Sequence, residues 1–410
     1  MSNLKKITLK RGKEDSLQRF HPWVFSGAIA RADEGIAEGE VVDVVSAAGE
    51  LLARGHWQVG SIAVRVLTFA DEKIDVRWWE TRLREAYTMR SALGLTDNPR
   101  TTCYRLVHGE GDFLPGLVVD IYGSTAVLQA HSAGMFLARE QVVKALHAVY
   151  GGRLTAVYDK SAQTAPFKAG LGAVDGYLWR ADEPAATASG GDAPTQDPQT
   201  VFENGHAFLV DWQTGQKSGF FIDQRDSRAL VEKYAPGRTV LNTFCYTGGF
   251  SVYALAGGAK SVDSVDSSKT ATDLAARNVE LNAGPGAPHR AITGDAMEFV
   301  RASAADDYDL IILDPPAFAK HRGAIPAATV AYRRLNAEAI ARIRPGGILF
   351  TFSCSQAISR ELFRTTVFSA AAIAHRRVRI LHQLTQPADH PVSIFHPEGE
   401  YLKGLVLYIE

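Results

Sequence analysis

The sequence predicts an α/β protein whose C-terminal half forms a doubly wound, mostly parallel β-sheet. The sequence pattern differs between the two halves of the chain. From residue 239 onward, apolar β-type runs alternate with helical stretches, and each run ends in a polar or glycine-containing segment. The first 181 residues instead carry short β-type runs between turns, which indicates a small β-barrel followed by a central β-rich α+β domain. A chain of 410 residues is long enough for these parts.

The barrel is predicted from two runs near the N-terminus. Residues 40–45 (EVVDVV) and 62–67 (IAVRVL) are rich in β-branched side chains, and glycine-containing turns separate them. We expect the barrel to cover residues 1–72.

The central domain is expected over residues 73–181. It begins with helical periodicity over residues 73–94, and Gly94 ends that helix. Residues 117–122 (LVVDIY) and 125–129 (TAVLQ) then flank a Gly-Ser pair, a pattern typical of a β-hairpin.

The sheet of the C-terminal half is expected over residues 201–410, after a linker. Residues 182–200 contain almost no large apolar side chain, so we expect an exposed loop there. The strands are expected at residues 239–244, 261–265, 290–293, 308–313 and 347–353. Because ligands bind beyond the carboxyl ends of the strands in such sheets, the residues that follow each strand are the candidates for a site.

The first three strand ends together indicate a pocket for an adenosine group. A glycine-containing turn follows the first strand and would let the backbone approach a ligand. Asp266 ends the second strand, where it could accept hydrogen bonds from a ribose diol, and Asp295 follows the third, where it could meet an adenine amino group. The turn consists of Phe244, Cys245, Tyr246, Thr247, Gly248 and Gly249.

This order of turn, acid and acid favours S-adenosylmethionine (SAM) over a dinucleotide, because the chain lacks G-x-G-x-x-G. A simpler interpretation stays open, in which the glycines belong to a loop and the aspartates cap helices.

The fourth and fifth strand ends carry the residues expected to act on a substrate. Residues 314–318 (DPPAF) resemble the substrate-side signature of SAM-dependent methyltransferases, and Phe318 is placed to stack on an extruded base. Cys354 follows the fifth strand, where RNA pyrimidine-C5 methyltransferases keep their nucleophile. The alternatives are prolines that only end a strand and a buried, inert cysteine.

Composition indicates a cytoplasmic protein. The three cysteines, Cys103, Cys245 and Cys354, are scattered without metal-ligand spacing, so we expect neither disulfides nor a metal site. The N-terminus lacks the apolar core of a signal peptide, and no later run is long enough to cross a bilayer.

A net charge of −1 gives no overall signal for a nucleic-acid partner, but basic residues cluster locally. The residues expected to bind RNA are Lys5, Lys6, Lys10, Arg11, Trp23, Phe318 and Lys320. The alternative for each charge is ordinary solvated surface.

Further motifs resemble one family. Its signatures match residues 215–228 (GQKSGFFIDQRDSR), 314–316 (DPP), 353–355 (SCS), 388–391 (ADHP) and 397–404 (PEGEYLKG). These motifs resemble the bacterial 5-methylcytosine methyltransferases of 23S ribosomal RNA, and residues 21–27 (HPWVFSG) resemble the opening of that family's RNA-binding PUA domain.

The resemblance covers most of the chain. It implies a PUA-like barrel, a central domain and a Rossmann-like class I SAM methyltransferase domain. It also implies SAM as cofactor, with Gln224 and Arg225 among the residues that bind it, large-subunit RNA as partner, and a homodimer.

The expected reaction is covalent catalysis. Cytosine C5 is a weak nucleophile, so Cys354 would first attack C6, and Asp314 would hydrogen-bond the ring. His390 is a candidate base for the C5 proton, with Glu398, Glu400 or water as alternatives.

Other functions stay open at this point. Because the fifth strand end carries a cysteine and the fourth does not, uracil C5 is an alternative target. The DPP motif also resembles that of amino-group methyltransferases, which need no nucleophile. A non-catalytic RNA-binding scaffold and a small-molecule methyltransferase are the remaining alternatives.

Overall fold

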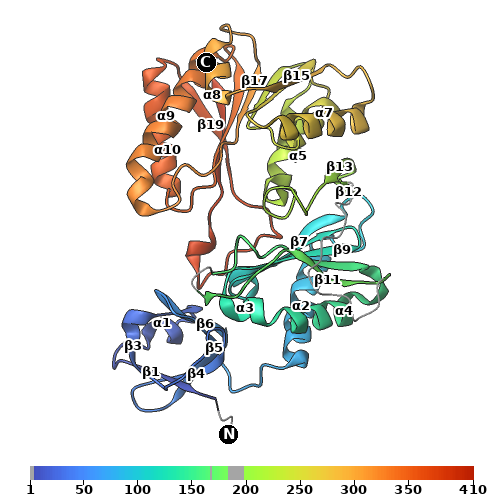
Figure 1. The fold of residues 1–410 in the computed structure, drawn as a ribbon. Coiled ribbons are helices and arrows are strands. Elements are labelled where there is room, and N and C mark those ends of the chain that lie inside the picture. The colour runs from blue at the N-terminus through green and yellow to red at the C-terminus, as the bar shows by residue number, and fades with distance from the viewer. Residues whose placement is uncertain (1–3, 167–168, 183–197) are drawn as a thin grey trace. The chain divides into compact units, whose positions relative to one another are not determined.

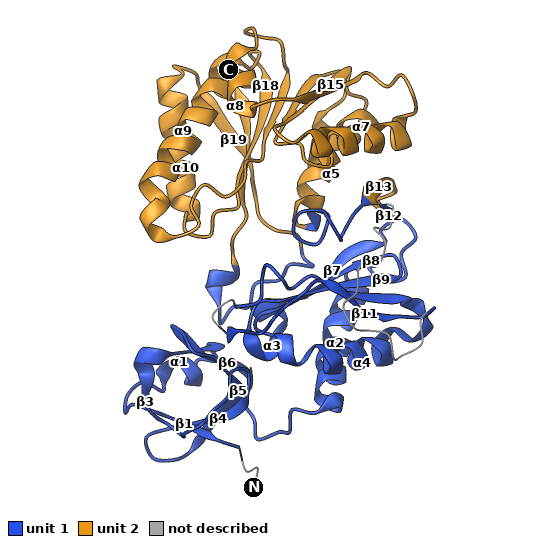
Figure 2. Ribbon diagram, viewed as in Figure 1, with its two compact units in different colours: residues 1–201, 210–222, 388–399 blue, residues 202–209, 223–387, 400–410 orange. Residues whose placement is uncertain are grey.

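A computed structural model describes residues 4–166, 169–182 and 198–410 (Figure 1). The chain divides into two compact units, coloured separately in Figure 2. Unit 1 comprises residues 1–201, 210–222 and 388–399, and unit 2 comprises residues 202–209, 223–387 and 400–410. Most of the expected linker, residues 183–197, lies outside the described residues, and its last two residues belong to a strand.

The N-terminal part of unit 1 is a six-stranded sheet in the order β2-β6-β5-β4-β1-β3. Its elements are β1 (Lys6–Leu9), α1 (Asp15–Gln18), β2 (Trp23–Phe25), β3 (Ile29–Ala32), β4 (Val41–Val45), β5 (Leu51–Trp57) and β6 (Ile62–Thr68). Among the described strands of this sheet, β1 and β4 are the one parallel pair. The predicted runs are β4 and β6. Since β2 and β3 are the two edges of this sheet, the predicted small barrel is a half-barrel.

The second part of unit 1 is a five-stranded sheet in the order β11-β10-β9-β8-β7, with α2 and α4 packed against each other. Its elements are α2 (Val76–Ala92), β7 (Cys103–His108), β8 (Leu117–Tyr122), β9 (Thr125–Ala130), α3 (Ala133–Leu137), α4 (Arg139–Tyr150), β10 (Ala156–Asp159) and β11 (Gly176–Arg180). The predicted hairpin is β8 and β9, which pair antiparallel. A continuous apolar core that includes Trp79, Leu83 and Leu106 fills this part.

Unit 2 contains a seven-stranded sheet in the order β16-β15-β14-β17-β18-β20-β19. Its elements are α5 (Arg225–Tyr234), β14 (Thr239–Thr243), α6 (Gly249–Ala256), β15 (Ser261–Asp266), α7 (Lys269–Ala283), β16 (His289–Thr293), α8 (Ala296–Ala302), β17 (Leu310–Leu313), α9 (Ile325–Arg342), β18 (Gly347–Ser353), α10 (Arg360–Ile373), β19 (Val378–Leu384) and β20 (Lys403–Ile409). The strands from β14 to β18 pair in parallel, as the sequence predicted.

The order of these strands creates a switch point. The chain builds outward from β14 through β15 to β16 and then returns to place β17 on the other side of β14. The segments that follow β14 and β17 therefore leave the sheet at adjacent carboxyl ends, where doubly wound folds bind their ligands.

The sequence did not predict the antiparallel end of the sheet. β20 pairs with β18, and β19 pairs with β20, both antiparallel. A hairpin of β12 (Gln199–Glu203) and β13 (His206–Val210) was also not expected. Among the described helices, none combines the length and the apolar character needed to cross a membrane.

Residues 210–222 and 388–399 fold with unit 1, although the sequence assigned them to the C-terminal part. The Asp389 carbonyl accepts a hydrogen bond from the Arg90 guanidinium (2.7 Å), and its carboxylate accepts one from the Arg105 amide (3.0 Å). The Arg90 side chain is fully buried and also pairs with Asp112. These long-range contacts cannot be deduced from local sequence.

Replacing Gly55 with alanine should destabilise the N-terminal sheet. A Cβ on Gly55 would lie 2.2 Å from the carbonyl oxygen of Arg65, and this backbone atom cannot swing away. We expect a local loss of about 1–3 kcal/mol, measured by hydrogen exchange of the β5 and β6 amides in the full-length protein. Gly27→Ala is the control, since its Cβ would meet nothing within 4 Å. Equal exchange in both variants would refute the prediction.

Candidate active site

The turn after β14 has a strained backbone. Phe244, Tyr246 and Gly248 have positive φ angles of 54°, 44° and 75°, a conformation that is uncommon for residues with side chains. Two hydrogen bonds to β15 hold the turn: the Cys245 amide donates to the Val265 carbonyl (3.1 Å), and the Tyr246 amide donates to Asp266 (3.0 Å). Such fixed strain is a common feature of ligand-binding segments.

The two predicted acids also stabilise the backbone. Asp266 accepts hydrogen bonds from the Tyr246 and Ser268 amides through different oxygens, and Asp295 caps α8 by accepting from the Glu298 amide (2.8 Å). Asp295 therefore caps a helix, as the simpler interpretation of the sequence expected. A carboxylate offers about four acceptor positions, so these bonds leave capacity for a ligand.

The glycines of the turn face protein atoms. A Cβ on Gly248 would lie 2.8 Å from the Cβ of Ala275, and one on Gly249 would lie 2.9 Å from the Arg228 side chain. Asn278 of α7 donates to the Thr247 carbonyl (2.8 Å). Close helix packing therefore requires glycine here, in addition to any approach of a ligand.

Cys245 is buried, and burial is the main cause that raises the pKa of its thiol. Its sulfur lies 3.9 Å from the Tyr246 carbonyl. A neutral thiol is a poor nucleophile, so Cys245 is not expected to attack a substrate. Because its side chain is buried, we expect any contact with a ligand to come from its backbone.

Arg225 and Gln224 start α5 in different environments. Arg225 is buried, and its Nε lies 3.7 Å from Glu203, which also holds Arg228 in a two-pronged ion pair (2.7 Å). Gln224 is also buried, and its Nε2 donates to Asp314 (3.0 Å). Its Oε1 is buried without a hydrogen-bond partner among the described residues.

The segments after β17 and β18 are connected to each other. The Cys354 sulfur lies 3.9 Å from the Pro315 carbonyl, and the Ala319 amide donates to the Ser355 hydroxyl (3.1 Å). Cys354 is partly exposed, whereas Ser355 is fully buried. The structure therefore brings Asp314 and Cys354, both predicted from sequence, to one edge of the sheet.

Tyr332 of α9 fixes the strand end around Cys354. Its hydroxyl lies 3.0 Å from the hydroxyls of both Ser353 and Ser355. Phe318 packs against the Tyr332 ring, with centroids 4.6 Å apart. Phe318 is half-buried in this position, and its stacking on a base stays a prediction.

Lys403 is a residue at this edge to which sequence reasoning gave no role. It lies opposite Ser353 in the β18–β20 pairing and is 4% exposed. Its ammonium donates to the Ser355 and Tyr401 carbonyls (2.6 Å each). Burial lowers its pKa to about 8, and the charge of Cys354 acts in the opposite direction. A lysine within an apolar β-run was the available signal.

His390 belongs to unit 1, whereas Asp314 and Cys354 belong to unit 2. Its Nδ1 lies 3.1 Å from the Asp389 carboxylate, and its ring lies 5.0 Å from that of His108. The ring is buried and oriented by an acid, as is typical of histidine bases. Of the alternatives, Glu400 forms an ion pair with Arg360 in unit 2.

Glu398 belongs to a cluster with His21 and His396, whose potential metal-ligand atoms lie within 4.8 Å of one another. His21 Nδ1 accepts a hydrogen bond from the Trp23 amide (3.3 Å), which puts the proton of the neutral ring on Nε2. That atom faces Glu398 (3.7 Å) and then has no lone pair for a metal. The cluster therefore fits a polar contact between the His21 ring N–H and the Glu398 carboxylate better than a metal site.

The residues expected to bind RNA differ in their contacts. Lys5 pairs with Glu40 (3.1 Å), and Lys10 donates to the Gly27 carbonyl (2.9 Å). The Trp23 ring packs on His396 (4.3 Å), and its indole N–H donates to Glu110 (2.8 Å). The exposed side chains in this set include those of Lys6, Arg11 and Lys320.

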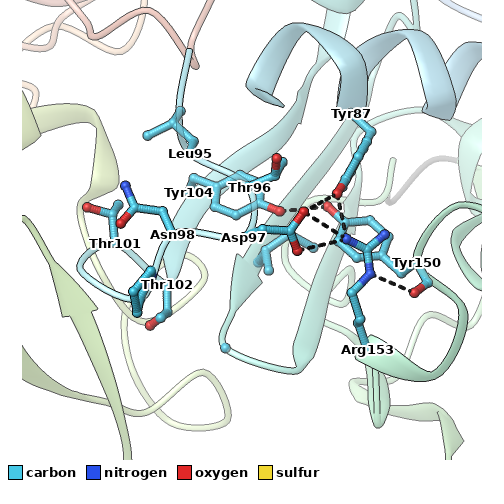
Figure 3. Close-up of a pocket in the computed structure, with 13 residues that line it drawn as sticks. Tyr87, Leu95, Thr96, Asp97, Asn98, Thr101, Thr102, Tyr104, Tyr150 and Arg153 are labelled. Atoms are coloured by element: carbon cyan, nitrogen blue, oxygen red, sulfur yellow. Dashed lines mark hydrogen bonds and ion pairs between the residues drawn. The ribbon is translucent and has the colours of Figure 1, made fainter. Parts of the chain in front are cut away.

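A cavity of about 440 Å³ lies in the central part of unit 1 (Figure 3). The Arg153 guanidinium bonds both oxygens of Asp97 (2.9 and 3.2 Å) and the Tyr87 hydroxyl, and the hydroxyls of Tyr104 and Tyr150 bond each other (2.9 Å). These polar groups satisfy one another, so we assign the cavity no part in catalysis.

Comparisons with known proteins agree with this arrangement. A family model described as S-adenosylmethionine-dependent methyltransferase matches residues 105–394, and a model described as PUA-like domain matches residues 7–69. The chain is 41% identical over 403 residues to "Ribosomal RNA large subunit methyltransferase I" of Erwinia tasmaniensis, covering 97% of this chain and 98% of that one. A protein of the same name from Salmonella typhi is 40% identical over 403 residues, with 97% and 96% covered.

Solved structures with a similar fold include a Streptococcus mutans protein assigned as a SAM-dependent methyltransferase. Its TM-score is 0.80 at 23% identity, with 98% of this chain and 99% of that chain covered. Another structure, a methyltransferase complexed with SAH, has a TM-score of 0.81 at 23% identity, with the same coverage. At this identity, the likeness shows the fold.

Replacing Asp266 with alanine should weaken SAM binding by about 1–3 kcal/mol, because the variant removes both the acceptor predicted for the ribose and the bond to the Tyr246 amide. Titration calorimetry with SAM measures the effect. Asp273→Ala is the matched control, since Asp273 is exposed on the neighbouring helix and pairs with Lys269. Unchanged affinity in Asp266→Ala would locate the pocket elsewhere.

Proposed function

The chain belongs to the family of SAM-dependent methyltransferases that carry a PUA-like domain, and we propose that it methylates C5 of a cytosine in the RNA of the large ribosomal subunit. The names of its full-length relatives support the RNA target. The observation that carries the C5 assignment is Cys354, a partly exposed cysteine beside the Asp-Pro-Pro loop at the carboxyl edge of the sheet.

The residues of unit 2 fit SAM. The strained turn 244–249 and Asp266 suit its adenosine. The buried Oε1 of Gln224 is an acceptor that could receive a hydrogen bond from the amino group of SAM. When bound, SAM supplies an electrophilic methyl group at the edge formed by Asp314 and Cys354. The remaining chemistry falls to side chains of this protein.

Cys354 starts the reaction as a thiolate. Its sulfur forms a bond to C6 of the cytosine, and the electron pair of the C5–C6 double bond moves into the ring, which makes C5 nucleophilic. After C5 is methylated, a base removes the C5 proton, the double bond re-forms, and the carbon–sulfur bond breaks. The enzyme recovers its thiolate.

Asp314 stabilises the activated ring by accepting a hydrogen bond from the cytosine amino group, or, when its carboxyl group carries a proton, by donating that proton to the ring nitrogen. The bond from Gln224 to one carboxylate oxygen of Asp314 holds the carboxyl group in orientation. Gln224 is therefore a positioning residue for Asp314 in addition to its expected contact with the cofactor.

His390 is the base that we propose for the C5 proton. The Asp389 carboxylate beside Nδ1 supports this role, because it stabilises the imidazolium that forms when the ring accepts a proton. Glu400 is a weaker candidate. A base must accept a proton, and the ion pair of Glu400 with Arg360 would be lost when its carboxylate does so.

The PUA-like half-barrel is proposed to hold the RNA through its exposed basic residues, while the target base is extruded. A cytoplasmic location and a homodimer also belong to this proposal. The support for the homodimer is the family resemblance, and light scattering of the purified protein would measure it.

Cys354→Ala should abolish methyl transfer to large-subunit RNA and leave SAM affinity unchanged, because the C6 adduct has no other nucleophile. Tritium transfer from labelled SAM measures turnover. Cys103→Ala is the control, since Cys103 is buried in β7 of unit 1. If Cys354→Ala still methylates RNA, the C5 assignment fails and an exocyclic amino group becomes the target.

Combining Lys6→Glu with Arg11→Glu should weaken RNA binding and reduce the slope of log K against log salt by about 2, because each substitution leaves one phosphate without its basic partner. Fluorescence anisotropy with a large-subunit RNA fragment over a salt series measures both. The control combines Lys260→Glu with Lys269→Glu, two exposed lysines of unit 2. Equal slopes in the two double variants would rule out the expected contacts of Lys6 and Arg11 with RNA.

A further inference from the structure

Lys403 is an unusual residue for the interior of a sheet. It begins β20, directly opposite Ser353, the last residue of β18, and Cys354 follows Ser353. Only 4% of its surface is exposed. Burying an ammonium group is unfavourable unless hydrogen bonds and an opposite charge compensate for the lost water.

Backbone carbonyls compensate in part. The Lys403 ammonium donates to the carbonyls of Ser355 and Tyr401, both at 2.6 Å. An ammonium has three donors, so these two bonds fix its position with one donor left over. Because one acceptor is the carbonyl of the residue after Cys354, the ammonium is held at the strand end that carries the cysteine.

Charges near the ammonium point to Cys354. Burial is the main influence on the pKa of Lys403 and lowers it to about 8. Among neighbouring charges, that of Cys354 acts most strongly and raises this pKa, whereas the charge of Arg360 lowers it. At pH 7 most molecules therefore carry an ammonium at this position.

We propose that the Lys403 ammonium stabilises the Cys354 thiolate and so activates the cysteine of the methyl-transfer site. The thiol proton leaves to solvent, and the negative sulfur provides the opposite charge that a buried ammonium requires. Lys403 is a positioning residue in this role, since it acts through Cys354. The inference rests on the proposed function for the use of the thiolate, but the pair itself can be tested without RNA.

Other groups face the pair. Arg360 forms an ion pair with Glu400, which offsets its charge. The Asp314 carboxylate lies at the same edge of the sheet. The Tyr332 hydroxyl contacts the serines on both sides of Cys354. Burial raises the pKa of this phenol, so it adds no charge to the site. Lys403 is the cation that hydrogen bonds hold at the strand end from which Cys354 follows.

The test is the pH dependence of Cys354 alkylation by iodoacetamide in the full-length protein, followed by peptide mass spectrometry so that the other cysteines do not interfere. An isolated thiol has a pKa of about 8.5. We expect a midpoint at least one pH unit lower in the unaltered protein. A midpoint at or above the ordinary value would overturn the proposal without any variant.

Variants separate charge from structure. Lys403→Met should move the midpoint upward by at least one unit, which slows alkylation at pH 7 about tenfold. Lys403→Arg keeps the charge and should keep the low midpoint, and Arg360→Gln is the control for a nearby cation and should shift it little. An unchanged midpoint in Lys403→Met would contradict the proposal.

The outcome is independent of the reaction assigned to the site. If Cys354→Ala retains methyl transfer while the alkylation midpoint depends on Lys403, the proposed function fails and the ion pair stands. If Cys354→Ala is inactive but Lys403→Met leaves the midpoint unchanged, the function stands and this inference fails.

Discussion

The candidate site depends on the position where the chain reverses its direction of strand addition. β17 lies beside β14 because the chain returns across the sheet after β16. This one constraint makes the segments after β14 and β17 neighbours, and β18 extends the same carboxyl edge. The turn proposed to bind the cofactor, the Asp-Pro-Pro loop and Cys354 all follow strands of this parallel set.

Hydrogen bonds across strand ends convert that proximity into fixed geometry. Asp266 holds the Tyr246 amide, Gln224 holds Asp314, and the Ser355 hydroxyl holds the Ala319 amide. The bonds of Asp266 and Ser355 join segments that the sheet brings together but does not by itself align, and Gln224 reaches Asp314 from the start of α5. The antiparallel strand β20 adds Lys403, whose ammonium holds the Ser355 carbonyl. Fixed positions of this kind are what methyl transfer needs, since the reacting atoms must meet within a narrow range of geometry.

The sequence predicted the parts of the fold that depend on local pattern. The runs that became β14 to β18 are apolar and end in polar or glycine-containing segments, and their carboxyl ends carry Asp266, Asp314 and Cys354. Features set by distant contacts were not predictable. The pairing of Lys403 with Ser353, the hydrogen bonds that hold Asp389 in unit 1, and the packing that requires Gly248 depend on residues far away in the chain.

In the proposed reaction, Cys354 forms a bond to C6 of a cytosine. Large-subunit RNA that carries 5-fluorocytidine tests this claim directly, because fluorine at C5 cannot leave as a proton and the adduct is trapped. Mass spectrometry of the digested complex should find the nucleotide on the peptide that contains Cys354. A complex without a covalent adduct, or an adduct on another residue, would contradict the account.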